Sequence, residues 1–385
     1  MNRRTASMFA VACGLAVANV YYAQPLLEVV SADMGLSQAV AGVIGTVTQI
    51  GYGAGLVLIV PLGDLVNRRR LVVGQTVLSA LALVAVALAP TAPVLLAGLM
   101  AVGALAVVTQ VLVAYSASLA DPSERGRIVG IVTSGIIIGI LLARTVSGTV
   151  ADLTGWRSVY VLAAAAALVM AALLWTKLPR DDEPRERISY PRLIGSLFTL
   201  FATVAVLRTR AVLALLIFMG FTVLATPMVL PLSAPPYSLS TTEVGLFGLA
   251  GAVGALGASH AGRLTDRGHG QRVTGIGLAV MLASWIPIAL LPHSLWGLVI
   301  GVLVIDFGLQ SVHVANQSLI YRTRPEAQSR LTAGYMVFYS VGSATGAIVS
   351  TVTYTHTGWA GVCVLGATIG LIALLFWIIA DRRRF

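Results

Sequence analysis

The sequence predicts an all-α membrane protein of 12 transmembrane helices, built as two parallel six-helix repeats. Of its 385 residues, 57% are hydrophobic and only 10% are charged, so charge could not cover a water-facing surface of ordinary size. Apolar stretches of about 20 residues, the length that crosses a hydrocarbon core, recur along the chain. The second half of the chain also repeats residues of the first at a constant spacing.

The expected spans fall into two sets of six, with a polar segment between them. The spans are residues 7–30, 38–62, 71–90, 93–119, 128–151 and 157–176, then 209–232, 242–263, 272–292, 295–319, 331–354 and 359–380. We therefore expect a first half at 1–176, a cytoplasmic linker at 177–208 and a second half at 209–385. In the linker, Leu193, Leu197, Leu200, Val204 and Leu207 recur at helical spacing, which predicts an interfacial helix along the inner leaflet.

The net charge of +10 reflects topology. All 25 Lys and Arg except Arg144 and Arg157 fall on the side that holds both termini if every predicted span crosses the membrane. The positive-inside rule therefore predicts a bacterial inner-membrane, multi-pass protein with both termini in the cytoplasm, and no nucleic-acid partner. The start of the chain could mimic a signal peptide, but its apolar stretch is too long, so we expect an uncleaved first helix.

The composition favours a transporter that is not driven by ATP. Lys177 is the single lysine and no phosphate-binding loop motif is present, so energy must come from a gradient. The loops are too short for a catalytic domain, and we expect no enzyme activity. Cys13 and Cys363 are too few for a disulfide framework or a thiolate metal site, so we expect neither metal nor cofactor. The expected partners are a small-molecule substrate, protons and the lipid bilayer, for a monomeric protein.

The repeat has an offset of 203 residues. The Thr-Gly-Trp triplet at 154–156 falls on the same triplet at 357–359 (357 − 154 = 203), and Pro122 and Arg127 fall on Pro325 and Arg330. Six helices per unit is an even number, so both halves have the same orientation in the membrane. Small residues four apart, as in Gly51–Gly55, Gly139–Ala143 and Gly342–Gly346, predict close helix packing.

Two connections carry an acid followed by arginines. Asp64 precedes Arg68 between the second and third spans, and Asp266-Arg267 lies between the eighth and ninth. Both connections resemble the G-x-x-x-D-R-x-G-R-R signature of the major facilitator superfamily, although Val60 and Asn67 replace glycines in the first. The resemblance implies that Asp64, Arg68, Asp266 and Arg267 form a conformational latch at helix N-termini. The alternative is an Asp that only caps a helix in a basic loop.

The fifth span resembles the antiporter motif of the same family, G-x-x-x-G-P-x-x-G-G. Ala143 stands at the second glycine and Arg144 at the proline. The second half has Gly342, Gly346 and Ser350 in register without the charge, and the usual arginine of the fourth span is absent.

Two charges lie deep inside predicted spans. Each costs about 2.5–3.5 kcal/mol to insert, so Arg144 must face a cavity or a partner. Asp306 is the acid deepest in a span, and counting from the outer ends places the two residues about 4.5 Å apart in depth. We expect a functional charge pair; a purely structural ion pair is the alternative.

The tenth span carries a polar stripe. Asp306, Gln310, His313 and Gln317 lie within about 60° of one another on a helix, so they should face water or substrate. A protonatable Asp with a His two turns away is the minimal equipment for proton coupling. An isolated His would more often be only a hydrogen-bonded core residue.

Polar and aromatic side chains within spans suggest a roomy cavity. We expect Asn19, Tyr22, Gln49, Gln310, Tyr335 and Tyr339 to bind substrate, whereas Trp156 and Trp359 suit interfacial anchoring. The run from Asn19 to Leu27, with the Asp306 and Arg144 segments, resembles bacterial sugar-efflux and multidrug-efflux permeases. That resemblance spans the chain and implies proton-coupled export of a small organic compound by alternating access. The alternatives are an organic-anion carrier with Arg144 as counter-ion, or a non-transporting membrane receptor.

Overall fold

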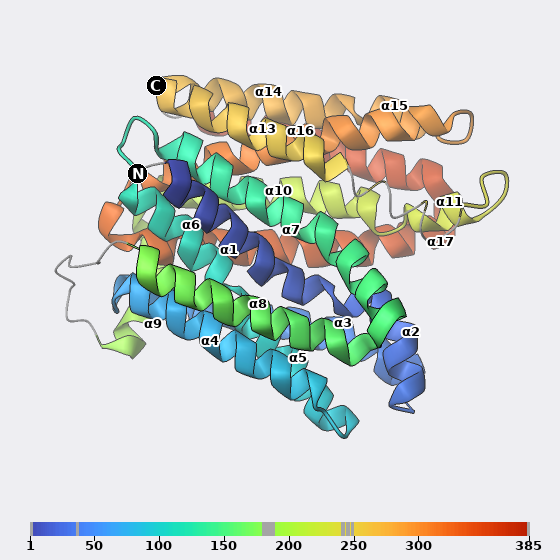
Figure 1. Ribbon diagram of the computed structural model, residues 1–385. Coiled ribbons are helices and arrows are strands. Elements are labelled where there is room, and N and C mark those ends of the chain that lie inside the picture. Colours follow the sequence, from blue (N-terminus) through green and yellow to red (C-terminus); the bar gives the residue numbers. More distant parts are fainter. Residues whose placement is uncertain are drawn as a thin grey trace. The chain divides into compact units, whose positions relative to one another are not determined.

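The computed structural model describes residues 3–35, 38–178, 189–239, 243, 247 and 250–382, and within these ranges the chain forms helices and no strand (Figure 1). It divides into two compact units. The first contains Met1–Leu119, Gly135–Thr199 and Pro325–Ala333; the second contains Ala120–Ser134, Leu200–Arg324 and Gly334–Phe385.

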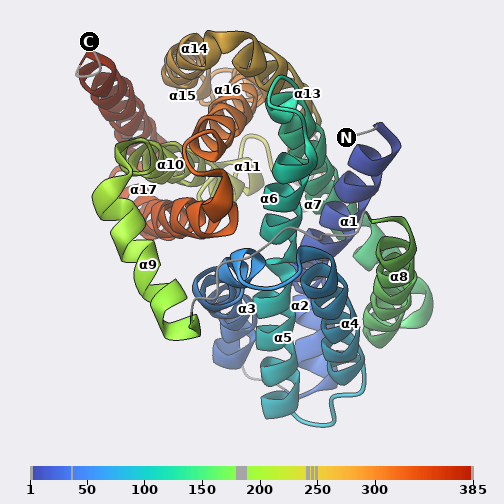
Figure 2. The same cartoon turned by 90° about the vertical axis from the view of Figure 1, so that its left-hand side faces the viewer.

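In the first unit, α4 packs against both α5 and α8, and α1 packs against α6 (Figures 1 and 2). Its helices are α1 (Arg3–Tyr21), α2 (Ala23–Asp33), α3 (Gln38–Leu58), the 3-10 turn η1 (Val60–Asp64), α4 (Arg68–Ala87), α5 (Ala92–Ala106), α6 (Val108–Leu119) and α8 (Trp156–Lys177), with most of α7 (Arg125–Thr154) and of α9 (Tyr190–Thr203) and the turn η4 (Pro325–Ala327).

In the second unit, α16 is central, and α10, α13, α14 and α15 all pack against it. Its helices are α10 (Ala205–Ala225), α11 (Val229–Ser233), α13 (Ala250–Leu264), the π-turn η3 (Thr265–His269), α14 (Gly270–Ala283), α15 (Trp285–Ala289) and α16 (Leu295–Tyr321), with most of α17 (Gln328–Arg382).

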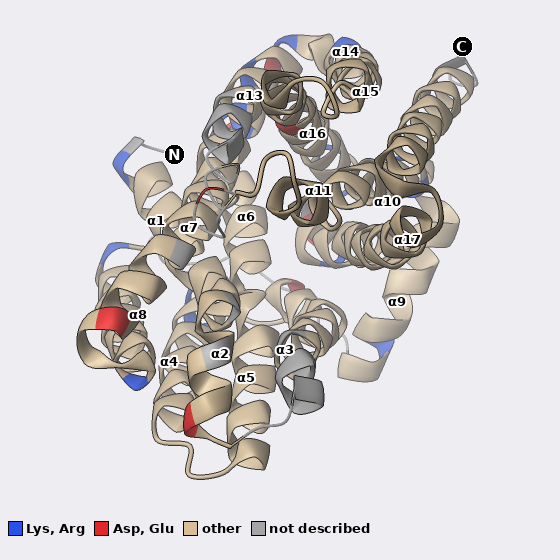
Figure 3. Cartoon of the chain, turned by 90° about the vertical axis from the view of Figure 1, so that its right-hand side faces the viewer, with Lys and Arg blue, Asp and Glu red and all other residues tan. Residues whose placement is uncertain are grey.

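These helices correspond to the predicted spans. Among the described residues, nine helices are long and apolar enough to cross a membrane, or ten if the bent pair α1–α2 is one span. The last of these, α17, covers both final predicted spans. Its backbone leaves the helical conformation at Gly358, where φ is 63°, and this break separates the two spans. Most of the expected start of the eighth span, at 240–249, lies outside the described residues. In Figure 3 the helices are mostly uncharged, and Lys and Arg gather near helix ends.

The expected close packing of small residues is confirmed. A Cβ atom added to Gly51 would lie 2.1 Å from the Met100 carbonyl oxygen, so α3 and α5 touch through their backbones. Gly139 meets Gly14 in the same way, and Gly342 meets the Leu215 carbonyl oxygen at 2.2 Å. Small side chains at these positions therefore set the helix spacing inside each unit.

Two long helices each belong to both units. The first residues of α7, up to Ser134, pack in the second unit, and the rest of α7 packs in the first. The first residues of α17, up to Ala333, pack in the first unit, and the rest of α17 packs in the second. The two starts are the places where the acids of the predicted latch are found.

The linker helix differs in one detail from its expected pattern. Leu193 and Leu197 are buried on α9, as the spacing predicts. The helix ends before Val204, whose ψ of 93° is not helical, so Leu207 belongs to α10. The Arg208 guanidinium donates hydrogen bonds to the carbonyl oxygens of Phe201 and Ala202, which are left unpaired at the end of α9.

Candidate functional site

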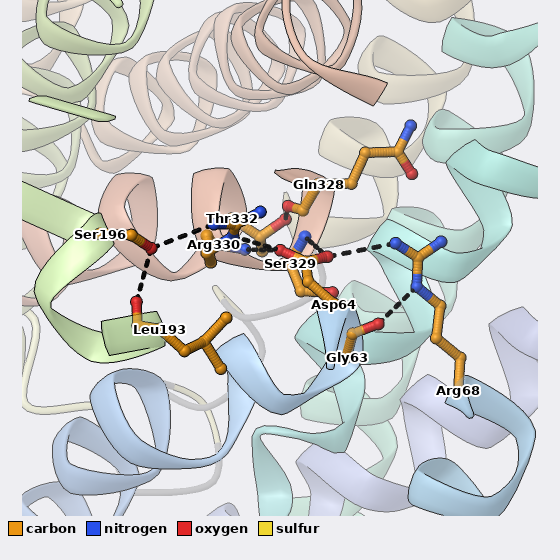
Figure 4. A network of polar contacts seen from close by, with 9 residues as sticks. All are labelled: Gly63, Asp64, Arg68, Leu193, Ser196, Gln328, Ser329, Arg330 and Thr332. Atoms are coloured by element: carbon orange, nitrogen blue, oxygen red, sulfur yellow. Dashed lines mark hydrogen bonds and ion pairs between the residues drawn. The ribbon is translucent and has the colours of Figure 1, made fainter. Parts of the chain in front are cut away.

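Asp64 caps the start of α17 (Figure 4). Its carboxylate accepts hydrogen bonds from the backbone N–H groups of Ser329 at 3.0 Å and Arg330 at 2.9 Å. The Arg330 Nε donates at 3.1 Å and the Arg68 Nη2 at 3.2 Å. A helix N-terminus carries unpaired N–H groups and a partial positive charge, so a carboxylate is its natural cap. The Asp64 side chain is only 1% exposed, which makes these bonds strong. We call this group the Asp64 cap.

The local sequence holds the Asp64 cap in place. Arg68 also donates from Nε to the Gly63 carbonyl oxygen at 2.8 Å, which fixes its guanidinium beside the carboxylate. Asn67, which stands at a signature glycine, caps α4 by accepting a hydrogen bond from the Arg70 N–H at 2.9 Å. The Arg330 Nη1 reaches the Ser196 hydroxyl of α9 at 3.1 Å, so the linker helix joins the same network (Figure 4).

Asp266 caps the start of α7 in the same manner. Its carboxylate accepts hydrogen bonds from the backbone N–H groups of Gly126 at 2.7 Å and Arg127 at 2.8 Å. The Arg322 Nη2 lies 3.4 Å from the carboxylate and 3.1 Å from the Thr265 carbonyl oxygen. We call this group the Asp266 cap. The two caps repeat one arrangement in the two halves of the sequence.

The basic residues of the Asp266 cap differ from those expected. Arg267 follows Asp266 directly but is exposed, and the cation that contacts Asp266 is Arg322, at the end of α16. Burial of Asp266 raises the energy of its charged form, and the N–H groups of α7 and Arg322 stabilise that form. The signature motif could not identify Arg322, because it lies 56 residues away in sequence.

The polar stripe of α16 is buried in the second unit. Asp306 is 6%, His313 7% and Gln317 2% exposed, and Gln310 is half-buried one turn after Asp306. The Gln310 side chain is within hydrogen-bonding range of the Asp306 carboxylate. A carboxylate in the middle of an apolar span is costly, which makes Asp306 a candidate functional residue.

Three of the predicted residues meet around Phe218 of α10. The His313 Nδ1 lies 2.9 Å from the Tyr335 hydroxyl oxygen. Phe218 packs edge-on against His313, with ring centroids 5.2 Å apart, and against Tyr339 at 4.1 Å. The structure thus brings together α10, α16 and α17 at a cluster with polar tips and apolar bodies, which suits binding of an amphipathic molecule.

The predicted residues of the first unit are more scattered. Asn19 and Tyr22 are buried, and Tyr22 stands at the break between α1 and α2, which meet at an angle of 42°. Gln49 is exposed on α3. The polar contact nearby involves Tyr52, whose hydroxyl accepts a hydrogen bond from the Gln110 Nε2 at 3.0 Å. Sequence reasoning missed Gln110, although it is a polar residue within the fourth span.

Arg144 and Arg157 are the two arginines predicted not to fall on the side of the termini, and the structure describes the side chain of one of them. The Arg144 side chain lies outside the described residues, so its pairing with Asp306 stays a prediction. Arg157, on α8, forms an ion pair with Asp33 at the end of α2 and lies over the Trp156 ring at 4.4 Å. The Trp156 Nε1 also donates to Asp33 at 3.1 Å. The local acid explains why a basic residue is tolerated at this end of α8.

Arg210 is a further charged residue of the second unit. It was expected among the basic residues of the cytoplasmic side, yet it is 1% exposed on α10. Its Nη1 donates to the Thr274 hydroxyl at 3.0 Å and to the Asn316 Oδ1 at 3.1 Å, and its Nη2 donates to the Gln271 Oε1 at 2.7 Å. Its position, inside the predicted span 209–232, was the signal that could have separated it from the loop residues.

Comparison with known proteins agrees with this architecture. The family model described as Major Facilitator Superfamily matches residues 9–327 and 261–384. The chain is 46% identical over 370 residues to the protein named "Uncharacterized transporter YgaY" of Escherichia coli O157:H7, covering 96% of this chain and 94% of that one. It is 22% identical to a "Probable sugar efflux transporter" of Helicobacter pylori strain 26695, covering 68% of this chain and 64% of the other.

A solved structure has the same fold. The human organic anion transporter MFSD10 (TETRAN) superposes with a TM-score of 0.80 at 15% identity, covering 98% of this chain and all of the other. The helices, the internal repeat and these matches support one conclusion. The chain belongs to the Major Facilitator Superfamily and is a multi-pass secondary transporter with no enzyme activity.

Proposed function

We propose that this transporter exports a small organic compound in exchange for protons, with Asp306 as the coupling carboxylate. The observation that carries the proposal is the burial of Asp306 near the middle of α16, beside Gln310. An acid that is buried within a membrane span can take up a proton when its access to water changes. Asp306 and His313 are the two titratable groups of the stripe, and we place the coupling proton on Asp306.

We infer the substrate class from the cluster around Phe218 and from Gln310 on the same helix as His313. Gln310, His313 and Tyr339 offer hydrogen-bonding tips beside apolar bodies, which fit a drug-like or sugar-like molecule, and Tyr335 acts on the substrate through its bond to His313. A relative named as a sugar efflux transporter supports the direction of transport and the substrate class by analogy alone. Asn19, Tyr22 and Gln49 are the substrate contacts that we propose from the first half of the sequence.

The Asp64 and Asp266 caps are the proposed conformational latches. Each carboxylate is bound to the start of a long helix, α17 or α7, that belongs to both compact units. Breaking a cap frees a helix start, which an alternating-access cycle requires. We place both caps and both termini on the cytoplasmic side, because the basic residues gather there. Arg68 belongs to the first latch, and Arg322 replaces Arg267 in the second.

The experiment uses inside-out vesicles that hold an acid-interior pH gradient, to which neutral, cationic and anionic compounds are added in turn. We expect at least one compound to collapse the gradient with the wild type and not with Asp306→Asn. Asp152→Asn, which changes an exposed acid near the end of α7, is the matched control and should behave as the wild type.

Other outcomes separate the alternatives. A compound that is transported while the gradient never responds would show that proton coupling is wrong. Transport of anionic compounds alone, lost on Arg144→Gln, would identify an organic-anion carrier. Tight binding without flux would identify a receptor.

A further inference from the structure

A chain of hydrogen bonds runs from a buried cation to the polar stripe of α16. It consists of Arg210, Asn316, Tyr335 and His313, from α10, α16 and α17, and we call it the Arg210 chain. Every member is at least nine-tenths buried: Asn316 is fully buried, Arg210 and Tyr335 are 1% exposed, and His313 is 7% exposed. Because the groups are buried, they do not exchange hydrogen bonds with water, and each group stays a donor or an acceptor toward its partner in the chain.

The chemistry of Arg210 fixes that direction. A guanidinium has donors only, so the Asn316 side chain must turn its Oδ1 toward Arg210. Its Nδ2 then points at the Tyr335 hydroxyl oxygen, 3.5 Å away, and can only donate to it. The hydrogen of that hydroxyl is left for an acceptor, and the His313 Nδ1 at 2.9 Å is the acceptor that the described residues offer.

Arg210 itself is held on two further sides. The Gln271 Oε1 of α14 accepts hydrogen bonds from both Arg210 and the Trp377 Nε1, the latter at 3.2 Å. Trp377 packs on Gly275, where an added Cβ would lie 2.4 Å from its ring. Five predicted spans thus meet at this guanidinium or at its partners, so it cannot turn away from Asn316 without disturbing all of them.

A second proton on His313 would conflict with this arrangement. A proton on Nδ1 would face the Tyr335 hydroxyl, whose hydrogen would then lose its acceptor. It would also place a second cation in the same dehydrated region as Arg210, where like charges repel strongly. Around His313, α17 contributes Tyr335 and Tyr339, α10 contributes Arg210 through Asn316, and Asp306 lies seven residues earlier on α16.

We propose that Arg210 is a positioning residue that keeps His313 neutral, with Nδ1 accepting the Tyr335 hydrogen bond and Nε2 carrying the proton. The relevance to transport rests on the proposed function. With His313 fixed in this form, Asp306 is the member of the stripe that is free to exchange a proton. His313 then serves as a hydrogen-bond donor through Nε2, and Arg210 controls which atom carries that hydrogen.

The test is ¹⁵N NMR of histidine-labelled full-length protein at about pH 5 and about pH 8, which brackets ordinary histidine titration. The protein has five histidines, and the His313→Asn spectrum identifies the resonances to assign. We expect the His313 Nδ1 to show the signature of an unprotonated acceptor at both pH values. In Arg210→Met we expect loss of this signature at low pH or a mixture of both tautomers. Arg208→Met, an exposed arginine on the same helix, is the control and should match the wild type.

Two results would overturn the inference. One is a wild-type His313 that carries a proton on Nδ1 or titrates in this range; the other is an Arg210→Met spectrum identical to that of the wild type. If Arg210→Met does not fold, Tyr335→Phe removes the donor nearest His313 and must release the tautomer. The spectra are independent of the vesicle assay. A neutral His313, together with a transported compound that leaves the gradient unchanged, keeps this inference and rejects proton coupling. A titrating His313 with an Asp306-dependent response does the reverse.

Discussion

Asp64 binds Arg330 twice, through the backbone N–H at 2.9 Å and through the side-chain Nε at 3.1 Å. The backbone bond needs only a free N–H group at the start of a helix, whereas the side-chain bond needs an arginine at position 330. Asp266 uses only the backbone bond to the equivalent Arg127 and takes its cation from Arg322. The Asp64 cap therefore includes, besides Arg68, an arginine side chain from the helix that it caps, whereas the arginine of the Asp266 cap comes from another helix.

Asp64→Asn should open the Asp64 cap. An amide keeps the size of the side chain but loses the charge, and hydrogen bonds to a charged group contribute about 1.5–3 kcal/mol. We therefore expect the equilibrium between the closed and the open cap to shift about tenfold or more toward the open form. The measurement is the alkylation rate of Thr332→Cys, a position 1% exposed near the start of α17, in a protein without Cys13 and Cys363. The rate should rise about tenfold. Asp152→Asn is the control, and an unchanged rate in Asp64→Asn would contradict the latch.

Gly262→Ala should disturb the Asp266 cap without changing any charge. The added Cβ would lie 2.1 Å from the Gly126 carbonyl oxygen, so the start of α7 must move. Overpacking of this kind costs about 1–3 kcal/mol, and the midpoint of thermal unfolding in detergent should fall. Gly148→Ala is the matched control, because nothing lies within 4 Å of its added Cβ and a helix favours Ala over Gly. Equal midpoints for the two variants would show that the contact at Gly262 is not tight.

The stability that Asp33 contributes should come from its hydrogen bond to Trp156 more than from its ion pair with Arg157. Asp33→Asn keeps an oxygen for the Trp156 Nε1 and loses only an ion pair whose two side chains are 43% and 44% exposed, so it should unfold close to the wild-type temperature. Asp33→Leu leaves the buried indole N–H without its acceptor and should unfold a few degrees lower. Thermal unfolding of both variants and of Arg157→Gln compares the two effects. If Asp33→Asn and Asp33→Leu unfold together, the Trp156 bond contributes nothing.

The proposed orientation predicts which loops reach the outer face of the membrane. Thr91, between α4 and α5, and Ser123, before α7, are both exposed. In intact cells and in the cysteine-free background, a membrane-impermeant maleimide should label Thr91→Cys and not Ser123→Cys. In inside-out vesicles the pattern should reverse. Labelling of Ser123→Cys in intact cells would invert the topology and remove the basis for placing both caps in the cytoplasm.

The fold was predictable because lipid imposes simple rules. A span must be apolar and about 20 residues long, and Arg and Lys mark the cytoplasmic connections. The constant offset then divided the spans into repeats, and Gly51 and Gly342 marked helix contacts that the structure confirms. Helix breaks were harder to predict, because the interruption of α17 at Gly358 depends on one backbone dihedral angle.

Polar partners were predictable only where they are close in sequence. Asp64 and Arg68 are four residues apart, so the motif could pair them. Arg322 with Asp266, and Arg210 with Asn316, are brought together by tertiary packing across 56 and 106 residues. A single sequence does not show which distant residues meet in the fold, so Asn316 could not be predicted as a partner of Arg210, even though the place of Arg210 inside a predicted span distinguished it from the loop arginines.

The tryptophans of the repeated Thr-Gly-Trp triplet show how the two halves have diverged. Trp156 donates to the Asp33 carboxylate, and Trp359 donates at 3.1 Å to the Ile288 carbonyl oxygen. At the offset of 203, Asp33 falls on Pro236 (33 + 203 = 236), so the second half has no acid at that position. A backbone carbonyl cannot be removed by a point mutation, whereas a carboxylate can. The Trp359 bond therefore survives any side-chain substitution at Ile288 that keeps the helix, whereas the Trp156 bond is lost when Asp33 is replaced by a residue without an acceptor.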